Sequence, residues 1–155
     1  MRQVACVIPA YDAAATLEAV VSGLRVALPD AILIVVDDGS SDATHDVASA
    51  CCDRAVRFRA NRGKGAALRA GFDVAHAECV HAVITIDADG QHDPSRAPAL
   101  LAALAEADIV IGTRARTPGA MPIVSAVYRI LFEHQPPRAA IGELMRRELR
   151  AEGDT

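Results

Sequence analysis

The feature that most constrains this chain is the β-branched apolar run at residues 83–86, which ends abruptly in acidic residues. Such a run is typical of a buried strand, and Asp87 and Asp89 follow it directly. Asp93 and Pro94 then provide a helix cap and a first turn, because a proline at that position needs no N–H donor. Ligands of open α/β sheets bind at the carboxyl ends of the strands. We therefore expect Asp87 and Asp89 at a ligand site.

Short apolar segments alternate with helical patterns along the first two thirds of the chain. Strands are expected at residues 3–8, 32–36, 55–59, 81–86 and 108–112. Helices are expected at 17–28 and 43–52, after the loop at 61–65, and from residue 94 onward. This alternation indicates an α/β fold with a mainly parallel sheet covered on both faces. After residue 116 the pattern weakens, and only helices are expected, at 123–132 and 139–151.

Acidic side chains follow three of the expected strands. They are Asp12, the pair Asp37 and Asp38, and the pair Asp87 and Asp89. In a parallel sheet these strand ends share one edge, so the five carboxylates are expected in one cleft. Carboxylates held close together shift one another's pKa values, and Mg²⁺ or Mn²⁺ would relieve the repulsion, since both prefer oxygen ligands.

Capping of a helix or turn is the alternative interpretation for each acid. We prefer it for Asp42 and Asp93, because helix starts favour residues of this type. For Asp12 both interpretations stay open. For Asp87 and Asp89 we prefer the ligand site, because the pair comes directly after a buried strand.

The basic residues that could belong to the site, Arg114, Lys64 and His92, are indicated less specifically by the sequence than the acids. Arg114 ends the fifth expected strand and fits a phosphate contact or an exposed surface position equally well. The glycines that flank Lys64 match neither a Walker loop nor a dinucleotide fingerprint, so a simple turn is the better interpretation. His92 fits a loop position better than a metal ligand.

Composition excludes several other functions. The chain has 155 residues, 52% of them apolar, which suits one globular domain. Its net charge of −4 and aromatic content of 3% argue against a nucleic-acid partner. It lacks an apolar run of about 18 residues that could span a membrane.

The four cysteines, two of them adjacent, suit neither a zinc site nor a disulfide framework. Buried or partly buried, reduced thiols in a cytoplasmic protein are the expected state.

Five short motifs occur in an order that resembles a known family. They lie at residues 7–11, 35–42, 61–67, 87–94 and 109–114. Together they resemble the family 2 glycosyltransferases, especially the branch that is similar to dolichol- or polyprenol-phosphate mannose and glucose synthases. The resemblance implies a three-layer GT-A fold, the Rossmann-like architecture of nucleotide-diphospho-sugar transferases. It also implies a nucleotide-sugar-binding core at 1–116, with a diverged or truncated helical tail at 117–155 in the same domain.

The resemblance implies a role for each matching residue. The implied nucleotide-binding residues are Pro9, Tyr11, Asp12, Asp37, Asp38, Lys64, Asp87 and Ala88. The implied metal ligands are Asp87 and Asp89, which form a DXD motif, together with Gln91. The implied catalytic residues are Asp89 and Arg114. This agrees with the chemistry, because carboxylates accept hydrogen bonds from ribose hydroxyls and base N–H groups, and Mg²⁺ or Mn²⁺ neutralises a leaving diphosphate.

The resemblance implies that an acceptor oxygen displaces the nucleotide at the anomeric carbon of the sugar. A GDP- or a UDP-sugar would be the donor, and a polyprenyl phosphate at the cytoplasmic membrane face would be the acceptor. Two departures qualify this expectation. Asp12 and Ala13 replace the Asn-Glu pair of the family, and residues 117–155 show no Asp-Thr-x-x-Gly-Phe-like acceptor motif.

These departures leave three functions open. The first is an active glycosyltransferase, and the second is a non-catalytic protein that binds a nucleotide sugar. The third is a nucleotidyltransferase of similar fold. We favour it least, because residues 9–11 replace the glycine-rich first loop expected of that class.

Overall fold

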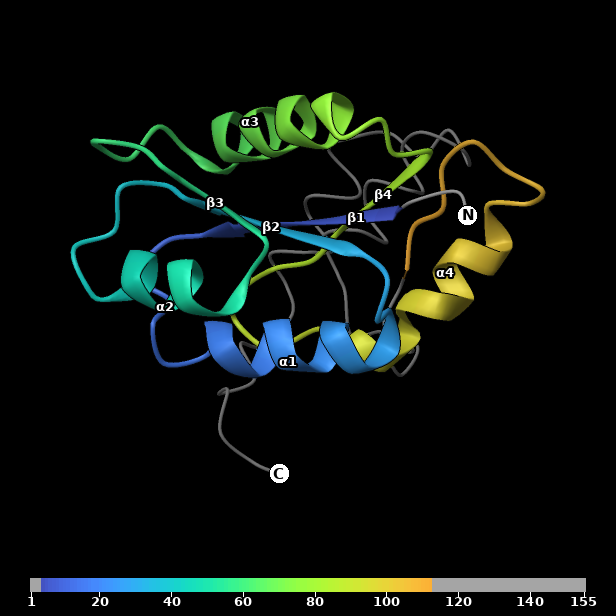
Figure 1. Ribbon diagram of the computed structural model, residues 1–155, viewed down its shortest axis with the longest axis horizontal. Helices are drawn as coiled ribbons and strands as arrows, with labels where there is room; N and C mark the ends of the chain where they lie inside the picture. The colour runs from blue at the N-terminus through green and yellow to red at the C-terminus, as the bar shows by residue number, and fades with distance from the viewer. Residues whose placement is uncertain (1–3, 113–155) are drawn as a thin grey trace, which may run out of the picture. The chain divides into compact units, whose positions relative to one another are not determined.

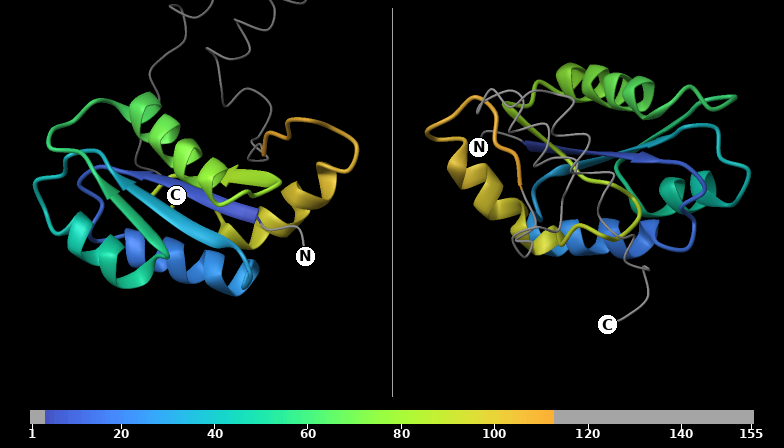
Figure 2. Two further views of the ribbon diagram at one scale, coloured as in Figure 1. Left: turned by 45° about the horizontal axis from the view of Figure 1, so that its top comes forward. Right: turned by 180° about the vertical axis from the view of Figure 1, so that it is seen from behind.

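The computed structural model describes residues 4–112, which form a parallel sheet with helices on both faces (Figure 1). The strands are β1 (Val4–Ala10), β2 (Ile32–Asp37), β3 (Arg54–Arg57) and β4 (Ala82–Thr85), in the spatial order β3-β2-β1-β4. The helices are α1 (Leu17–Ala27), α2 (Thr44–Cys51), α3 (Lys64–Ala77) and α4 (Ala97–Ala103), with a 3₁₀ turn, η1 (Pro94–Arg96), before α4. Helix α3 covers one face of the sheet, and α1, α2 and α4 lie on the other (Figures 1 and 2). The predicted three-layer α/β fold is confirmed.

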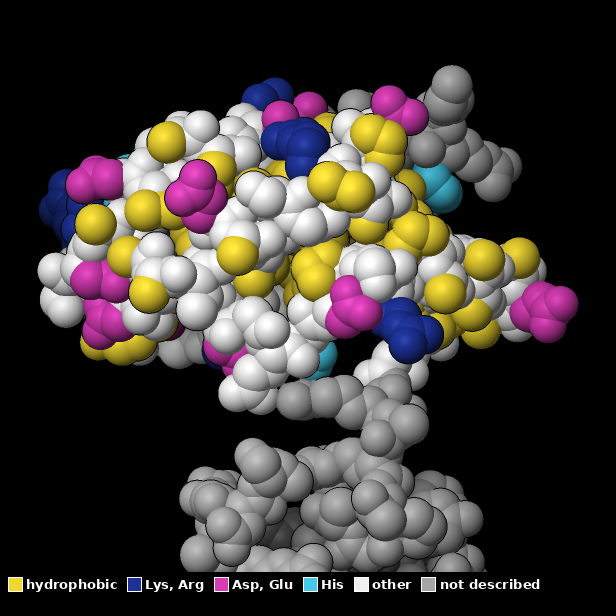
Figure 3. All heavy atoms as spheres, turned by 90° about the horizontal axis from the view of Figure 1, so that it is seen from below, with side chains coloured by type: hydrophobic (Ala, Val, Ile, Leu, Met, Phe, Trp, Pro, Cys, Tyr) yellow, Lys and Arg dark blue, Asp and Glu magenta, His cyan; other side chains and the backbone are white. Residues whose placement is uncertain are grey.

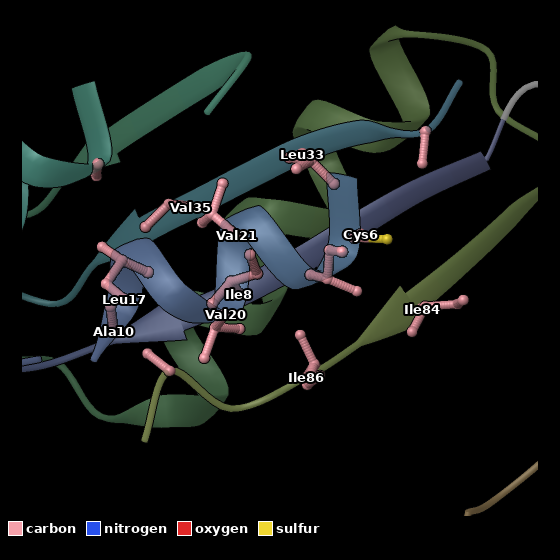
Figure 4. Close-up of a cluster of buried hydrophobic side chains, with 14 of the residues drawn as sticks. Cys6, Ile8, Ala10, Leu17, Val20, Val21, Leu33, Val35, Ile84 and Ile86 are labelled. Atoms are coloured by element: carbon pink, nitrogen blue, oxygen red, sulfur yellow. The ribbon is translucent and has the colours of Figure 1, made fainter. Parts of the chain in front are cut away.

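The two central strands are apolar throughout because both of their faces are buried. In β1, Cys6 and Ile8 point toward α1, whereas Ala5 and Val7 point toward α3. The larger cluster, on the α1 side, is shown in Figure 4. Helix α1 contributes its buried side chains to this cluster at the spacing of one helical face: Leu17, Val20, Val21 and Leu24.

Helix α3 packs on the sheet through small residues. Ala67, Gly71 and Ala75 are its buried positions, and they repeat every four residues along one side of the helix. This side faces β1 and β2. Small side chains let the helix backbone approach the sheet closely, which brings the start of α3 near the ends of the strands.

The predicted element ends differ from the observed ones at two places that matter for the site. Pro9 and Ala10 belong to β1, where they pair with Val36 and Asp37 of β2, rather than to a loop. Lys64 is the first residue of α3, although the sequence placed it in the preceding loop.

The fifth strand predicted at residues 108–112 is wrong. No residue of this segment has strand structure, and Ile109 and Ile111 are 79% and 80% exposed. A strand needs a hydrogen-bonded neighbour as well as an apolar pattern. Within residues 4–112 this segment pairs with no other strand.

The described residues up to Ile111 belong to one compact unit. The helices predicted at 123–132 and 139–151, and the tail at 117–155 as a whole, lie outside the described residues. Among residues 4–112 no helix combines the length and apolar character needed to cross a bilayer.

On the face covered by α1 and α2, charged side chains are scattered among small apolar ones (Figure 3).

Candidate functional site

The site expected from the sequence lies where the strands end. We call residues 11–16 after β1 the first loop, residues 38–43 after β2 the second loop, residues 58–63 after β3 the third loop, and residues 86–93 after β4 the fourth loop. The first three leave the sheet at its left side in Figure 1. All four strands are parallel, so these loops share one edge of the sheet.

The first and second loops are held together by hydrogen bonds between groups about 30 residues apart. The backbone N–H of Asp12 donates to Ser40 Oγ at 2.9 Å, and that of Ala13 donates to Thr44 Oγ1 at 2.8 Å. In return, Asp12 Oδ1 accepts from the N–H of Ser41 at 2.8 Å. Asp12 itself has a φ of +47°, a left-handed conformation that these bonds maintain. The Asp12 side chain therefore holds the first loop against the second loop.

Asp42 extends this connection between the loops. Its Oδ2 accepts from the N–H of Ala14 at 3.1 Å, and its Oδ1 accepts from the N–H of Thr44 at 2.9 Å. The Thr44 hydroxyl also donates to Asp42 Oδ1. This side-chain hydrogen bond is the main cause that lowers the pKa of the Asp42 carboxyl, and the two backbone donors add to it. Asp42 therefore holds the turn that leads into α2, whereas the N-cap residue of α2 is Ala43, which makes no side-chain capping bond.

Asp37 is the last residue of β2 and Asp38 is the first residue of the second loop, and their side chains bind different partners. Asp37 is fully buried. Its Oδ1 accepts from the N–H of Ser40 at 2.9 Å, and its Oδ2 lies 3.3 Å from Arg57 Nε. Asp38 is also buried, and its two oxygens accept from the N–H groups of Arg62 and Gly63 at 2.7 and 2.8 Å. Asp38 thus ties the end of β2 to the start of α3.

The fourth loop carries the acids that the sequence singled out. Asp87 Oδ1 lies 2.7 Å from Lys64 Nζ, and Asp87 Oδ2 lies 3.7 Å from His92 Nε2. Asp89 Oδ1 accepts from the N–H of Gln91 at 2.9 Å, which closes a tight turn. Asp87 therefore presents both of its oxygens to basic groups, and Asp89 shapes the loop.

The backbone between these acids is held by the first loop. Ala88 is buried, and its carbonyl oxygen accepts from the hydroxyl of Thr16 at 2.6 Å. Further along, Asp93 Oδ1 accepts from the N–H of Ser95 at 2.9 Å, with Pro94 as the first residue of η1. The capping role predicted for Asp93 is confirmed, and Ser95 lowers the pKa of its carboxyl.

The five carboxylates expected in one cleft do not form a shared metal-binding group within residues 4–112. In the part of the chain that the structure describes, no group of three or more His, Cys, Asp or Glu side chains is placed to hold a metal ion. The physical reason is that Asp12, Asp37 and Asp38 accept hydrogen bonds from backbone N–H groups of the second and third loops. Within the described residues Asp87 accepts no such bond, and Asp89 accepts one, from Gln91 of its own loop.

These two carboxylates still fit a divalent cation of the magnesium class. Such ions typically bind through one or two protein carboxylates, with water and substrate phosphates as the other ligands. Asp87 already attracts positive charge from Lys64. Asp89 uses one oxygen for the turn, and within residues 4–112 its other oxygen has no hydrogen-bond donor. Asp87, Asp89 and Gln91 would supply the oxygen ligands.

The remaining predicted nucleotide-site residues lie around the same edge. Tyr11 follows β1 and is 52% exposed, so its ring is accessible to a ligand. Pro9 is half-buried within β1, and Lys64 is 61% exposed at the start of α3. Arg114 lies outside the described residues.

Two residues that hold the site were missed in the sequence. Thr16 fixes the Ala88 carbonyl, and Arg57 pairs with the buried Asp37. A Thr directly before the helical pattern at residue 17 is a capping signal that could have drawn attention to Thr16. No local pattern marks Arg57, because its partner lies on a different strand.

The cysteines take no part in this arrangement, and all four are free thiols. Cys6 is buried in β1, and burial raises its pKa to about 12. Burial also raises the pKa values of Cys51 and Cys52. Cys79 is exposed, contrary to the prediction that all four thiols would be at least partly buried.

Comparison with known proteins identifies the family. A family model described as "Glycosyl transferase family 2" matches residues 5–148. The chain belongs to glycosyltransferase family 2. This family 2 chain is 38% identical over 122 residues to an undecaprenyl-phosphate mannosyltransferase of Micrococcus luteus, a match that covers 76% of the chain and 50% of the relative. It is also 38% identical over 115 residues to a polyprenol monophosphomannose synthase of Mycolicibacterium smegmatis, covering 70% of the chain and 43% of the relative.

Solved structures confirm the GT-A fold of this family 2 chain. Glucosyl-3-phosphoglycerate synthase from Mycobacterium tuberculosis, in complex with Mn²⁺, UDP-glucose and phosphoglyceric acid, matches with a TM-score of 0.64 and 28% identity. The match covers 85% of this chain and 51% of that one. The chain therefore spans about half, or less, of the length of the relatives named here.

Proposed function

We propose that this chain binds a nucleotide-diphosphate sugar with a divalent metal ion and transfers the sugar to a polyprenyl phosphate. Two relatives at 38% identity, by their names, act on undecaprenyl phosphate or make a polyprenol monophosphomannose. A related structure holds Mn²⁺ together with UDP-glucose. The observation that carries the proposal is the pair Asp87 and Asp89 at the carboxyl end of β4, next to the Lys64 ammonium.

The proposed roles follow the family motifs that these residues match. The nucleotide would be bound by Pro9, Tyr11, Asp12, Asp37, Asp38, Lys64, Asp87 and Ala88. The metal would be held by Asp87, Asp89 and Gln91, where it would neutralise the leaving diphosphate. Asp89 and Arg114 would act at the reacting end of the donor. Because Asp12 is bonded to Ser41, we propose that it contributes by fixing the loop that carries Tyr11.

The proposed acceptor lowers the demand for a base. A phosphate monoester is already anionic near neutral pH, so its oxygen can attack the anomeric carbon of the sugar without losing a proton to a strong base. We propose that the reaction takes place at the cytoplasmic membrane face, where a polyprenyl phosphate would present its head group. GDP- and UDP-sugars are both compatible donors.

Calorimetric titration of the full chain tests the donor site. UDP, GDP, UDP-glucose and GDP-mannose would each be titrated with and without Mn²⁺. We expect one nucleotide class to bind, and to bind at least about tenfold more tightly with Mn²⁺. Asp89→Asn should abolish the effect of Mn²⁺, whereas Asp46→Asn, which removes an exposed acid on α2, should leave it unchanged. Equal affinity in wild type and Asp89→Asn would remove the metal assignment.

Product analysis separates the proposal from its alternatives. Transfer of labelled sugar to a polyprenyl phosphate supports an active glycosyltransferase. Donor binding without transfer would favour a protein that only binds nucleotide sugars. Release of pyrophosphate from a nucleoside triphosphate and a sugar phosphate would favour a nucleotidyltransferase.

A further inference from the structure

The ion pair between Lys64 and Asp87 joins two parts of the candidate site. Lys64 Nζ lies 2.7 Å from Asp87 Oδ1. Lys64 is the first residue of α3, and Asp87 lies in the fourth loop. The pair therefore connects the start of a helix on one face of the sheet with a loop that leaves the sheet edge.

Within residues 4–112 no other Lys or Arg forms an ion pair with this carboxylate. The second basic group near Asp87 is His92, at 3.7 Å from Oδ2. Arg62, two residues before Lys64, lies over the ring of Phe58 at 4.7 Å from its centroid. Within the described residues, Lys64 therefore supplies the cation that faces Asp87 Oδ1.

A divalent metal ion on Asp87 Oδ1 would compete with this ammonium group for the oxygen. Two cations on the same oxygen would repel each other strongly at such short distances. The lysine side chain can leave at little cost, since it is 61% exposed and has a flexible four-carbon stem. A nucleotide diphosphate would offer it anionic oxygens as new partners.

We infer that Lys64 occupies Asp87 in the absence of donor and yields this carboxylate to the metal when a nucleotide diphosphate binds. This inference rests on the proposed function. Lys64 would then couple the binding of the two ligands. Metal that binds alone must displace the ammonium group, whereas a nucleotide that binds with the metal offers the ammonium group a new partner. Such coupling is reciprocal, so the metal strengthens nucleotide binding by the same factor as the nucleotide strengthens metal binding.

Electron paramagnetic resonance of free Mn²⁺ tests this coupling without any measurement of transfer. The full chain would be titrated with Mn²⁺ in the absence and presence of saturating UDP or GDP, whichever binds. The variants are Lys64→Met and Lys64→Gln, which both remove the charge. The control is Arg69→Met, which removes the same charge from an exposed position further along α3.

We expect both Lys64 variants to bind Mn²⁺ alone about two- to fivefold more tightly than wild type, the range expected for loss of one exposed ion-pair competitor. The strengthening of Mn²⁺ binding by nucleotide should fall by about the same factor in these variants, since direct contact of Mn²⁺ with the diphosphate remains, and should stay at its wild-type value in Arg69→Met. A Lys64 variant that binds Mn²⁺ alone no more tightly than wild type would overturn the inference. An equal change in Arg69→Met would also overturn it, by showing a general charge effect.

The same titrations distinguish this inference from the proposed function. If wild type binds Mn²⁺ with nucleotide but the Lys64 variants show unchanged coupling, only the role of Lys64 is wrong. If neither wild type nor the variants bind Mn²⁺ even with nucleotide, the proposed metal site is wrong and the inference is overturned with it.

Discussion

Gly71 lies so close to Val7 that a Cβ atom at position 71 would stand 2.3 Å from Cγ1 of Val7. Real Cβ atoms do not approach another heavy atom so closely, and Val7 is fully buried in β1. The distance between α3 and the sheet therefore depends on a glycine at this position. Because α3 begins with Lys64, the same packing determines where the start of the helix meets the site.

We expect Gly71→Ala to destabilise the fold by about 1–3 kcal/mol through overpacking, although alanine is the better helix former. Gly65→Ala is the matched control in the same helix, because a Cβ there would meet nothing within 4 Å. It should be neutral or stabilising by up to about 1 kcal/mol. Urea denaturation measures the free energy of unfolding of both variants. Equal stability of the two would contradict the close packing of Gly71 against Val7.

The Asp38 carboxylate should hold the third loop in place. Asp38→Ala would leave the N–H of Arg62 without its acceptor and the N–H of Gly63 with Asn61 Oδ1 alone, at an expected cost of about 1–3 kcal/mol. Hydrogen exchange at these two amides should speed up. The amide of Leu33, which donates to Asp53 at the opposite end of β2, serves as an internal reference. Faster exchange of all three amides would instead indicate general unfolding.

Stability below neutral pH should depend on Asp42. Its pKa in the folded chain is lowered from 3.8, chiefly by the Thr44 side chain. Stabilisation by the charged carboxylate is therefore fully present above the unfolded pKa and is lost as the pH falls through the folded pKa. Wild type should be more stable than Asp42→Asn above about pH 5, and the difference should shrink on acidification. Denaturation at a series of pH values tests this, and a constant difference would disprove it.

The hydroxyl of Thr16 should position the fourth loop. Thr16→Val removes the donor to the Ala88 carbonyl, which lies between Asp87 and Asp89. We expect metal-dependent nucleotide binding to weaken about two- to tenfold, as for loss of one hydrogen bond. Thr16→Ser retains the hydroxyl and should bind nearly as wild type. Calorimetry decides between these results, and equal losses in both variants would contradict a specific role of the hydroxyl.

The fold was largely predictable because its strongest signals are local. The strand expected at 32–36 is observed as Ile32–Asp37, since a fully buried parallel strand is apolar throughout. The wrong prediction of a strand at residues 108–112 arises because strand pairing is not a local property. Ile109 and Ile111 give an apolar pattern, but a strand is defined by its neighbour, which a local pattern does not reveal.

The candidate site was predictable in part for the same reason. The turn made by Asp42 and the cap made by Asp93 join residues two positions apart, so the local preference of Asp for such positions identifies them. The partners of Asp38 lie 24 and 25 residues away, and those of Asp12 lie 28 and 29 residues away. Such contacts arise only when the loops meet at the sheet edge, and no local preference encodes them.

The hydrogen bonds between the first and second loops have a thermodynamic consequence. These loops are fixed by the chain's own groups, so they lose their conformational entropy on folding and have little left to lose on binding. A nucleoside that meets them should associate with a small ordering penalty. The fourth loop, held chiefly by the Thr16 hydroxyl and an exposed ion pair, would instead lose most of its freedom when the donor arrives.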